Sequence, residues 1–206
     1  MKNLIVIGHP DKKSFCYNGI LKTLKRELRK HKKKEQLKII DLYRDNYSTP
    51  RTKLMKGYQD LVTWADRIYF ISPVWWFRLT PRMEIFFDEV LTPGFAYKFV
   101  NFTKLYAYPK PFLKDKKVRT YITHGAPMLP VITLYLNSVK LRLVLGVFSF
   151  VFGWKPSRWR KTKQFWSVPF VSDKKRKKYL EVVLNDIRND LRTKNIFNHK
   201  PALQNR

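Results

Sequence analysis

The segment Ser72–Phe77, which reads Ser-Pro-Val-Trp-Trp-Phe, has residue types that suit a flat ligand. It continues the apolar run 67–71, a pattern typical of a buried strand. Open α/β sheets bind their ligands at the carboxyl ends of their strands, where this segment would lie. Two tryptophans and a phenylalanine there predict an aromatic wall against a conjugated ring system. The alternative is that these side chains only pack in the core.

A loop at residues 8–15 reads Gly-His-Pro-Asp-Lys-Lys-Ser-Phe and follows the first apolar run. It leads into a predicted helix, and the free N–H groups at a helix start favour an anion. Lys13 and the Ser14 hydroxyl would add donors at the same place. The chain has no G-x-G-x-x-G and no P-loop motif, so we do not expect a nucleotide held in those ways. In the alternative interpretation, Ser14 only caps the helix and His9 is a turn histidine.

A third loop, Thr123-His-Gly-Ala-Pro127, also stands at the end of an apolar run. Gly125 would allow a close approach of the backbone or a positive φ, and His124 would supply a hydrogen bond or a positive charge. The three loops are expected to meet at one edge of a sheet. One loop with anion donors, one aromatic loop and one glycine loop together predict a planar, phosphorylated cofactor.

The elements that would position these loops alternate between strands and helices. Strands are expected at 3–8, 37–43, 67–71 and 118–123, with a fifth, weaker one inside 157–168; helices are expected at 17–31, 55–65, 133–148 and 173–192, with another after Pro81. This alternation predicts an α/β fold with a parallel sheet covered on both faces. Residues 93–115 are predicted to be a long aromatic connection. We expect a single domain over residues 1–194 and a frayed tail over 195–206.

The chain is strongly basic, with 43 Lys and Arg against 15 Asp and Glu and a formal net charge of +28. Such a surface attracts polyanions, including anionic membranes and acidic partners. The basic runs lie on the solvated sides of predicted helices without a nucleic-acid motif, so no specific nucleic-acid partner is expected. The single cysteine fits a reducing compartment. We therefore expect a cytoplasmic protein that is able to lie peripherally at a membrane.

The motifs, taken in order, resemble those of the flavodoxin-like NAD(P)H:quinone oxidoreductases. They comprise residues 8–15, Asp41-Leu-Tyr43, Ala65-Asp66, Pro73-Val-Trp-Trp-Phe77, Thr92-Pro-Gly-Phe-Ala-Tyr97 and Thr123-His-Gly-Ala126. The resemblance runs from Lys2 to the closing helix. It implies a doubly wound, five-stranded parallel sheet of order 2-1-3-4-5 and a homodimer with active sites at the subunit interface. It also implies non-covalent FMN or FAD, NAD(P)H as hydride donor and a quinone-like acceptor, with ping-pong kinetics.

Carried over position by position, the resemblance implies three groups of site residues. The phosphate end of the flavin would be held by His9, Ser14 and Phe15, and its ring system by Pro73, Val74, Trp75, Trp76 and Phe77. The pyrimidine side would be supported by Thr123, His124, Gly125 and Ala126. Tyr97 and Phe99 would reach the substrate cavity, and a charged His124 would stabilise the reduced flavin. Catalytic roles are thus expected for His124 and Tyr97.

The chain departs from the animal enzymes of this family at two places. Val131 and Asn137 stand where those enzymes have a tyrosine and a histidine, and Ala126-Pro127 replaces their second glycine. These departures resemble the bacterial branch, which includes ancillary subunits of potassium-efflux systems. Two alternatives therefore remain beside the oxidoreductase: a flavin-bound regulatory subunit of a membrane transport system, and a basic binding protein on a degenerate flavodoxin scaffold.

Overall fold

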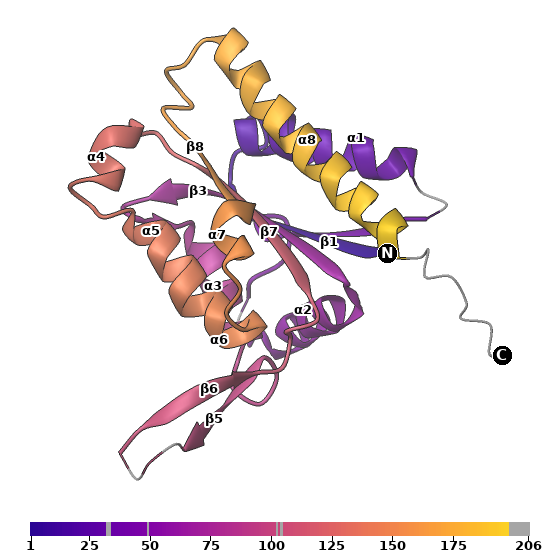
Figure 1. The fold of residues 1–206 in the computed structure, drawn as a ribbon, viewed down its shortest axis with the longest axis vertical. Helices are drawn as coiled ribbons and strands as arrows, with labels where there is room; N and C mark the ends of the chain where they lie inside the picture. The colour runs from indigo at the N-terminus through magenta and orange to yellow at the C-terminus, as the bar shows by residue number, and fades with distance from the viewer. Residues whose placement is uncertain (32–33, 49, 102, 104, 198–206) are drawn as a thin grey trace, which may run out of the picture.

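A parallel sheet of five strands forms the centre of the protein (Figure 1). The computed structural model describes residues 1–31, 34–48, 50–101, 103 and 105–197. The strand order is β2-β1-β3-β7-β8, and every neighbouring pair on this path is parallel. The predicted order 2-1-3-4-5 is confirmed. The strands are β1 (Lys2–Ile7), β2 (Gln36–Asp41), β3 (Arg67–Trp75), β7 (Lys117–Thr123) and β8 (Thr162–Phe165).

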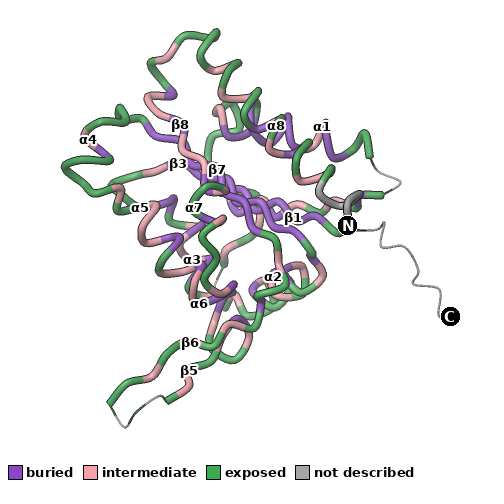
Figure 2. The backbone as a smooth tube through the Cα atoms, viewed as in Figure 1, coloured by how far each residue is buried: buried purple, intermediate pink, exposed green. Residues whose placement is uncertain are grey.

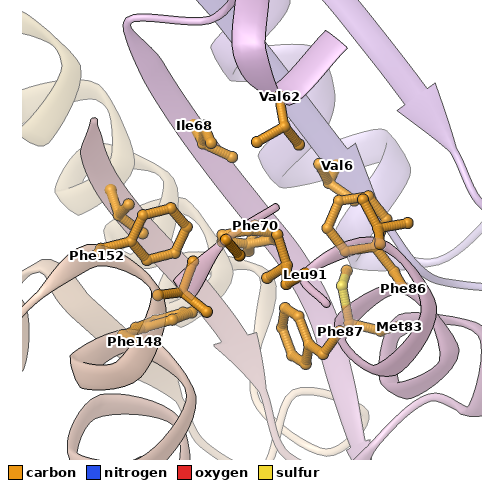
Figure 3. Close-up of a cluster of buried hydrophobic side chains, with 14 of the residues drawn as sticks. Val6, Val62, Ile68, Phe70, Met83, Phe86, Phe87, Leu91, Phe148 and Phe152 are labelled. Carbon is orange, nitrogen blue, oxygen red and sulfur yellow. The ribbon is translucent and has the colours of Figure 1, made fainter. Parts of the chain in front are cut away.

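The sheet is covered by helices on both faces, as the apolar strands require. Figure 2 shows the buried residues concentrated along the central strands. One face carries α2 (Thr52–Trp64), α3 (Pro81–Val90) and α6 (Phe148–Phe152), and the other carries α1 (Lys22–Lys30) and α8 (Asp173–Phe197). In Figure 3 the Phe70 ring on β3 lies among side chains from α3 and α6. Its centroid is 5.5 Å from that of Phe87 and 5.7 Å from that of Phe148.

Two predicted helices differ from the structure in detail. The predicted helix 17–31 begins with a π-helical segment, Cys16–Leu21, that continues into α1. The predicted helix 133–148 is wrong at its start, because α4 (Met128–Ile132) ends in a turn and the chain becomes helical again at α5 (Ser138–Leu141). A further π-helical segment, Arg142–Val147, joins α5 to α6. The break falls at Leu136 and Asn137, whose positive φ values of 48° and 51° do not fit a right-handed helix.

The long connection predicted at 93–115 is a β-hairpin. Its strands are β5 (Tyr97–Asn101) and β6 (Ala107–Pro111), which pair with each other in a separate two-stranded sheet. The base of the hairpin packs on α6: the Tyr97 and Phe150 ring centroids are 6.2 Å apart, and the Leu113 N–H donates to the Val151 carbonyl at 3.2 Å. The other end projects from the body of the molecule beyond α2 and α6 (Figure 1).

The closing helix α8 is held to the sheet by buried ion pairs. The Arg119 side chain on β7 is 6% exposed and lies 2.9 Å from carboxylate oxygens of both Asp186 and Asp190 on α8. Arg67 adds a 2.8 Å hydrogen bond to the Asp190 carbonyl. The helix continues to Phe197, three residues into the expected tail, and the remaining tail residues 198–206 lie outside the described part of the chain. None of the helices in the described ranges is long and apolar enough to cross a bilayer.

Candidate functional site

The three loops predicted from the sequence meet around one cavity of about 820 Å³, at the carboxyl ends of β1, β3 and β7. The cavity is the size of a typical small-molecule or cofactor site. Most of the residues predicted for the site contribute to its lining: His9, Ser14, Phe15, Pro73, Val74, Trp75, Thr123, His124 and Gly125. Trp76, Phe77, Ala126 and Tyr97 do not line it, so their expected placement in the site is not found within one chain.

The first loop presents an unpartnered hydroxyl at the cavity. Asp11 turns the loop, because its carboxylate accepts the Lys13 N–H at 2.7 Å while its own N–H donates to His9 Nδ1 at 3.0 Å. The Ser14 carbonyl starts the helix by accepting the Asn18 N–H at 2.9 Å. The Ser14 Oγ is buried and has no hydrogen-bond partner among the described atoms, so it does not cap the helix. A buried polar atom without a partner is costly, and a ligand acceptor in the cavity would remove that cost.

Buried hydrogen bonds connect the first loop to both ends of the aromatic loop. The Gly8 carbonyl accepts hydrogen bonds from Thr80 Oγ at 2.9 Å and from Ser72 Oγ at 3.4 Å. A Cβ on Gly8 would lie 2.8 Å from Thr80 Oγ, so this close approach requires glycine. The two loops therefore keep a fixed spacing on either side of the cavity.

The aromatic loop is a tight hairpin turn. Trp75 on β3 pairs with Arg78 on β4 (Arg78–Leu79), which leaves Trp76 and Phe77 as the two turn residues. Their φ values are 48° and 59°, the left-handed conformation that two-residue hairpin turns usually fill with Asn-Gly. Two bulky aromatic residues in that conformation store strain, which persists where function requires it. Trp76 is 93% exposed, so the alternative that it packs in the core is wrong.

The third loop closes the cavity beside β8. The His124 N–H donates to the Phe165 carbonyl at 2.7 Å, and the Val168 N–H donates to the His124 carbonyl at 2.9 Å. Gly125 does not have a positive φ, which corrects one of its two expected roles. Nothing lies within 4 Å of the position of a Cβ on Gly125, so this backbone is open to a close approach from a ligand.

His124 is neutral rather than charged. Its ring is buried and stacks on Trp166, with 4.2 Å between the centroids. The Gln164 amide nitrogen lies 3.0 Å from His124 Nε2 and 2.9 Å from Asn137 Oδ1, and it can only donate, so Nε2 accepts. Burial lowers the pKa of His124 to about 4. The expectation of a positive charge at His124 is therefore wrong, although the residue does line the cavity.

The cavity has a fourth wall that the sequence did not predict. It is formed by the loop after β8 and the first turns of α8, with Val168, Pro169, Asp173, Arg176, Lys177 and Leu180. The basic run 174–178 is predicted to be solvated helix surface, and its four lysines are exposed as expected. Arg176 differs, because it donates to the carbonyls of Val168 and Pro169 at 3.2 and 3.1 Å. The available signal was the position of this run shortly after the fifth strand, whose carboxyl end must meet the same edge of the sheet.

The charges around the cavity favour an anionic ligand. Asp173 is paired with Arg176 at 2.8 Å, and Asp11 is occupied by the backbone of its own loop. Lys13 and Lys177 line the cavity as well. Cys16 also lines it, but burial raises the pKa of this thiol to about 12, so it is not a nucleophile at neutral pH.

The comparisons with known proteins agree with this architecture. A profile of the flavodoxin-like fold matches residues 1–133. The chain belongs to the flavodoxin-like fold family. An uncharacterized NAD(P)H oxidoreductase of Haemophilus influenzae is 33% identical over 67 residues, which is 32% of this chain and 31% of that protein. The match thus spans about a third of the length of that relative.

Solved structures resemble nearly the whole of this flavodoxin-like chain. An NAD(P)H:quinone oxidoreductase from Methanothermobacter marburgensis superposes with a TM-score of 0.70 at 19% identity, over 92% of this chain and 98% of the other. An FMN-dependent NADH-azoreductase from Bacillus anthracis, solved in complex with FMN, gives 0.64 at 15% identity, over 90% and 98%. At these identities the likeness concerns the fold. The family resemblance inferred from the motifs, and the fold it implied, are confirmed.

Proposed function

We propose that this protein is a flavin-dependent oxidoreductase that transfers a hydride from NAD(P)H to a quinone-like acceptor. The observation that carries the proposal is the unpartnered Ser14 hydroxyl, buried at a cavity between an aromatic wall and an open glycine backbone. The named activities of the Haemophilus relative and of the two solved structures support it.

The cavity fits a flavin in both chemistry and size. Ser14 and Lys13 would hold the phosphate, as hydroxyl and ammonium donors at the start of a helix. Trp75 and the Pro73–Val74 backbone would lie against the ring system, and Gly125 leaves room for its opposite edge. The donor set suits the phosphate of FMN and the diphosphate of FAD equally.

The chemistry would come from the cofactor, because a bound flavin accepts a hydride from a nicotinamide and passes it to an acceptor. The protein residues orient the reactants and exclude water. Neutral His124 contributes a fixed hydrogen-bonding group beside Trp166, held by Gln164, and carries no charge. One cavity would serve donor and acceptor in turn, and this predicts ping-pong kinetics.

Ser14→Ala should weaken flavin binding about 10- to 100-fold, since a hydrogen bond to a charged group contributes about 1.5–3 kcal/mol. The same change should leave the stability of the flavin-free protein unchanged or raised, because it removes a buried hydroxyl without a partner. Quenching of FMN and FAD fluorescence measures the first effect, and thermal unfolding measures the second. Ser149→Ala on α6, away from the cavity, is the control: it should leave flavin binding unchanged and lower the stability slightly, because its hydroxyl donates to the Gly146 carbonyl.

Two outcomes would contradict the proposal. No quenching with either flavin would favour a binding protein on a degenerate scaffold. Tight flavin binding without turnover, with NADH or NADPH as donor and a soluble benzoquinone as acceptor, would favour the regulatory subunit.

We also propose a homodimer that forms over the cavity mouth. Exposed apolar side chains follow two of the lining residues, Trp75 and Gly125, on the β3–β4 turn and on α4 with the turn after it; this rim consists of Trp76, Met128, Leu129, Leu134 and Leu136. The Phe77 and Tyr135 rings, 4.2 Å apart, join its two parts. Exposed apolar patches of this kind mark interaction sites. A partner subunit would be the source of Tyr97, which does not reach the cavity of its own chain.

Replacing Trp76-Phe77 with Asn-Gly tests whether the strained turn is kept for this interface. The substitution fits the turn, so the monomer should gain about 1–2 kcal/mol of unfolding free energy. The dimer should dissociate in sedimentation equilibrium at micromolar concentration. Trp154→Asn, which changes an exposed tryptophan outside the rim, should alter neither quantity. If the double variant is less stable than the natural protein, the turn is not strained. If the double variant is still a dimer, the interface does not include this turn.

A further inference from the structure

The projecting end of the β5–β6 hairpin presents large apolar side chains to solvent. Leu105 is 99% exposed and Tyr106 62%, and Phe99 and Tyr108 are also exposed. These residues do not line the cavity. A projecting hairpin that carries this much exposed apolar surface is unusual for a soluble protein without a partner.

The hairpin also carries an exposed pair of lysines. In the register of the two strands Lys98 lies opposite Lys110, and the next pair on the same face is Val100 opposite Tyr108. Like charges directly opposite each other destabilise a strand pair, unless an anion lies between them. The sequence from 90 to 114 contains no Asp or Glu, so no acidic side chain within the hairpin can supply that anion.

The order of these side chains along the hairpin matches a bilayer interface. Leu105 lies farthest out among these side chains, Tyr106 and Tyr108 follow just before and within β6, and Lys98 lies three residues, or roughly 10 Å, before the last residue of β5 at about 3.3 Å per residue. Aromatic residues concentrate at the headgroup level of membranes, and lysines reach phosphates while their stems stay in apolar surroundings. The net charge of +28 attracts the same surface over longer distances.

We propose that the tip of the β5–β6 hairpin docks on an anionic phospholipid bilayer, with Leu105 and Tyr106 in the interface and Lys98 and Lys110 at the lipid phosphates. The base of the hairpin, packed on α6, holds it away from the body as a short arm. This docking goes beyond the proposed function and does not depend on it, because the cavity and the tip share no residues.

Cosedimentation with vesicles tests whether the tip of the hairpin binds an anionic bilayer. Vesicles of phosphatidylcholine with 30% phosphatidylglycerol should bind the protein at low salt, and vesicles of pure phosphatidylcholine should bind it far less. Lys98→Gln/Lys110→Gln should weaken partitioning about 30-fold, at about 1 kcal/mol per lysine. Leu105→Ser/Tyr106→Ser should weaken it at least about 10-fold. Lys22→Gln/Arg26→Gln, which removes the same charge from exposed positions on α1, should change it less than about 3-fold.

A fluorescent label on the tip gives a second, direct readout. Because Cys16 is buried and its thiol pKa is raised to about 12, Leu105→Cys provides a single reactive thiol for an environment-sensitive dye. The dye should shift to the blue when anionic vesicles are added, and a dye at Arg26→Cys should not. Equal losses in the hairpin and α1 charge variants would overturn the proposal. So would a tip dye that ignores vesicles, or one that shifts with protein concentration alone and thereby reveals a second copy at the tip.

Discussion

Replacing Arg119 with methionine should lower the free energy of unfolding by about 3–5 kcal/mol, as expected when one partner of a buried ion pair is removed. Asp186 and Asp190 would then be left facing the sheet without their counter-charge. Burial by itself lowers the pKa of Arg119, but the hydrogen bond to Asp190 and the interactions with surrounding groups, Asp186 among them, together raise it overall. Urea denaturation of the purified variant measures the loss.

Two further variants test whether the loss of stability in Arg119→Met comes from the unpaired, buried carboxylates. Lys56→Met breaks an exposed ion pair with Asp60 on α2 and should cost less than about 1 kcal/mol. Combining Arg119→Met with Asp186→Leu and Asp190→Leu should recover much of the loss, because the uncompensated carboxylates are gone. A cost below about 1 kcal/mol for Arg119→Met alone would show that α8 is held by its apolar contacts.

The second large effect is a loss of stability in acid that depends on His124. Its pKa is lowered to about 4 in the folded protein against 6.5 as its ordinary value, so the unfolded state binds the proton first. The stabilisation is complete above pH 6.5 and is lost as the pH falls toward 4. At pH 5 the loss relative to neutral pH should reach about 2 kcal/mol, with a slope that approaches about 1.36 kcal/mol per pH unit.

The comparison with a variant isolates this residue from the carboxylates. His124→Gln should remove most of the slope between pH 6.5 and 5, whereas His31→Gln, at an exposed position, should keep it. Urea denaturation at several pH values within this window measures both. An unchanged slope in His124→Gln would mean that another group, such as partly buried His9, whose pKa burial also lowers, is responsible.

The parallel sheet with helices on both faces could be predicted because its information is local and repeated, whereas the order of its strands was implied by the family resemblance. Each central strand is a run of apolar residues, and each run is followed by a helix whose buried stripe recurs every three or four residues. The β5–β6 hairpin could not be predicted in this way. Pro109 and Pro111 argue against a strand, since proline disrupts pairing inside a sheet. In a sheet of only two strands both are edges, so these prolines are tolerated.

The site was predictable as far as strand ends determine it. His9 and Gly125 come shortly after central strands and Trp75 is the last residue of β3, and strand ends must meet at one edge. Two features could not be predicted because they depend on tertiary packing. The charge of His124 depends on its burial, and the fourth wall of the cavity depends on where α8 crosses the sheet. The exposure of Trp76 could not be predicted either, because β3 extends to Trp75 and the tight turn points the next residue into solvent.

The four walls of the cavity differ in how easily they can move. The wall built on Gly8, Ser72 and Thr80 is locked by hydrogen bonds between buried groups, so its opening would disturb the sheet itself. The wall at 168–177 is tied to the third loop by the Val168–His124 backbone hydrogen bond, and its outer part is held by Arg176, which binds two carbonyls and Asp173. A tightly held ligand would therefore enter and leave by release of the Arg176 contacts, and the residence time of the ligand would depend on this start of α8 as well as on the residues that contact it.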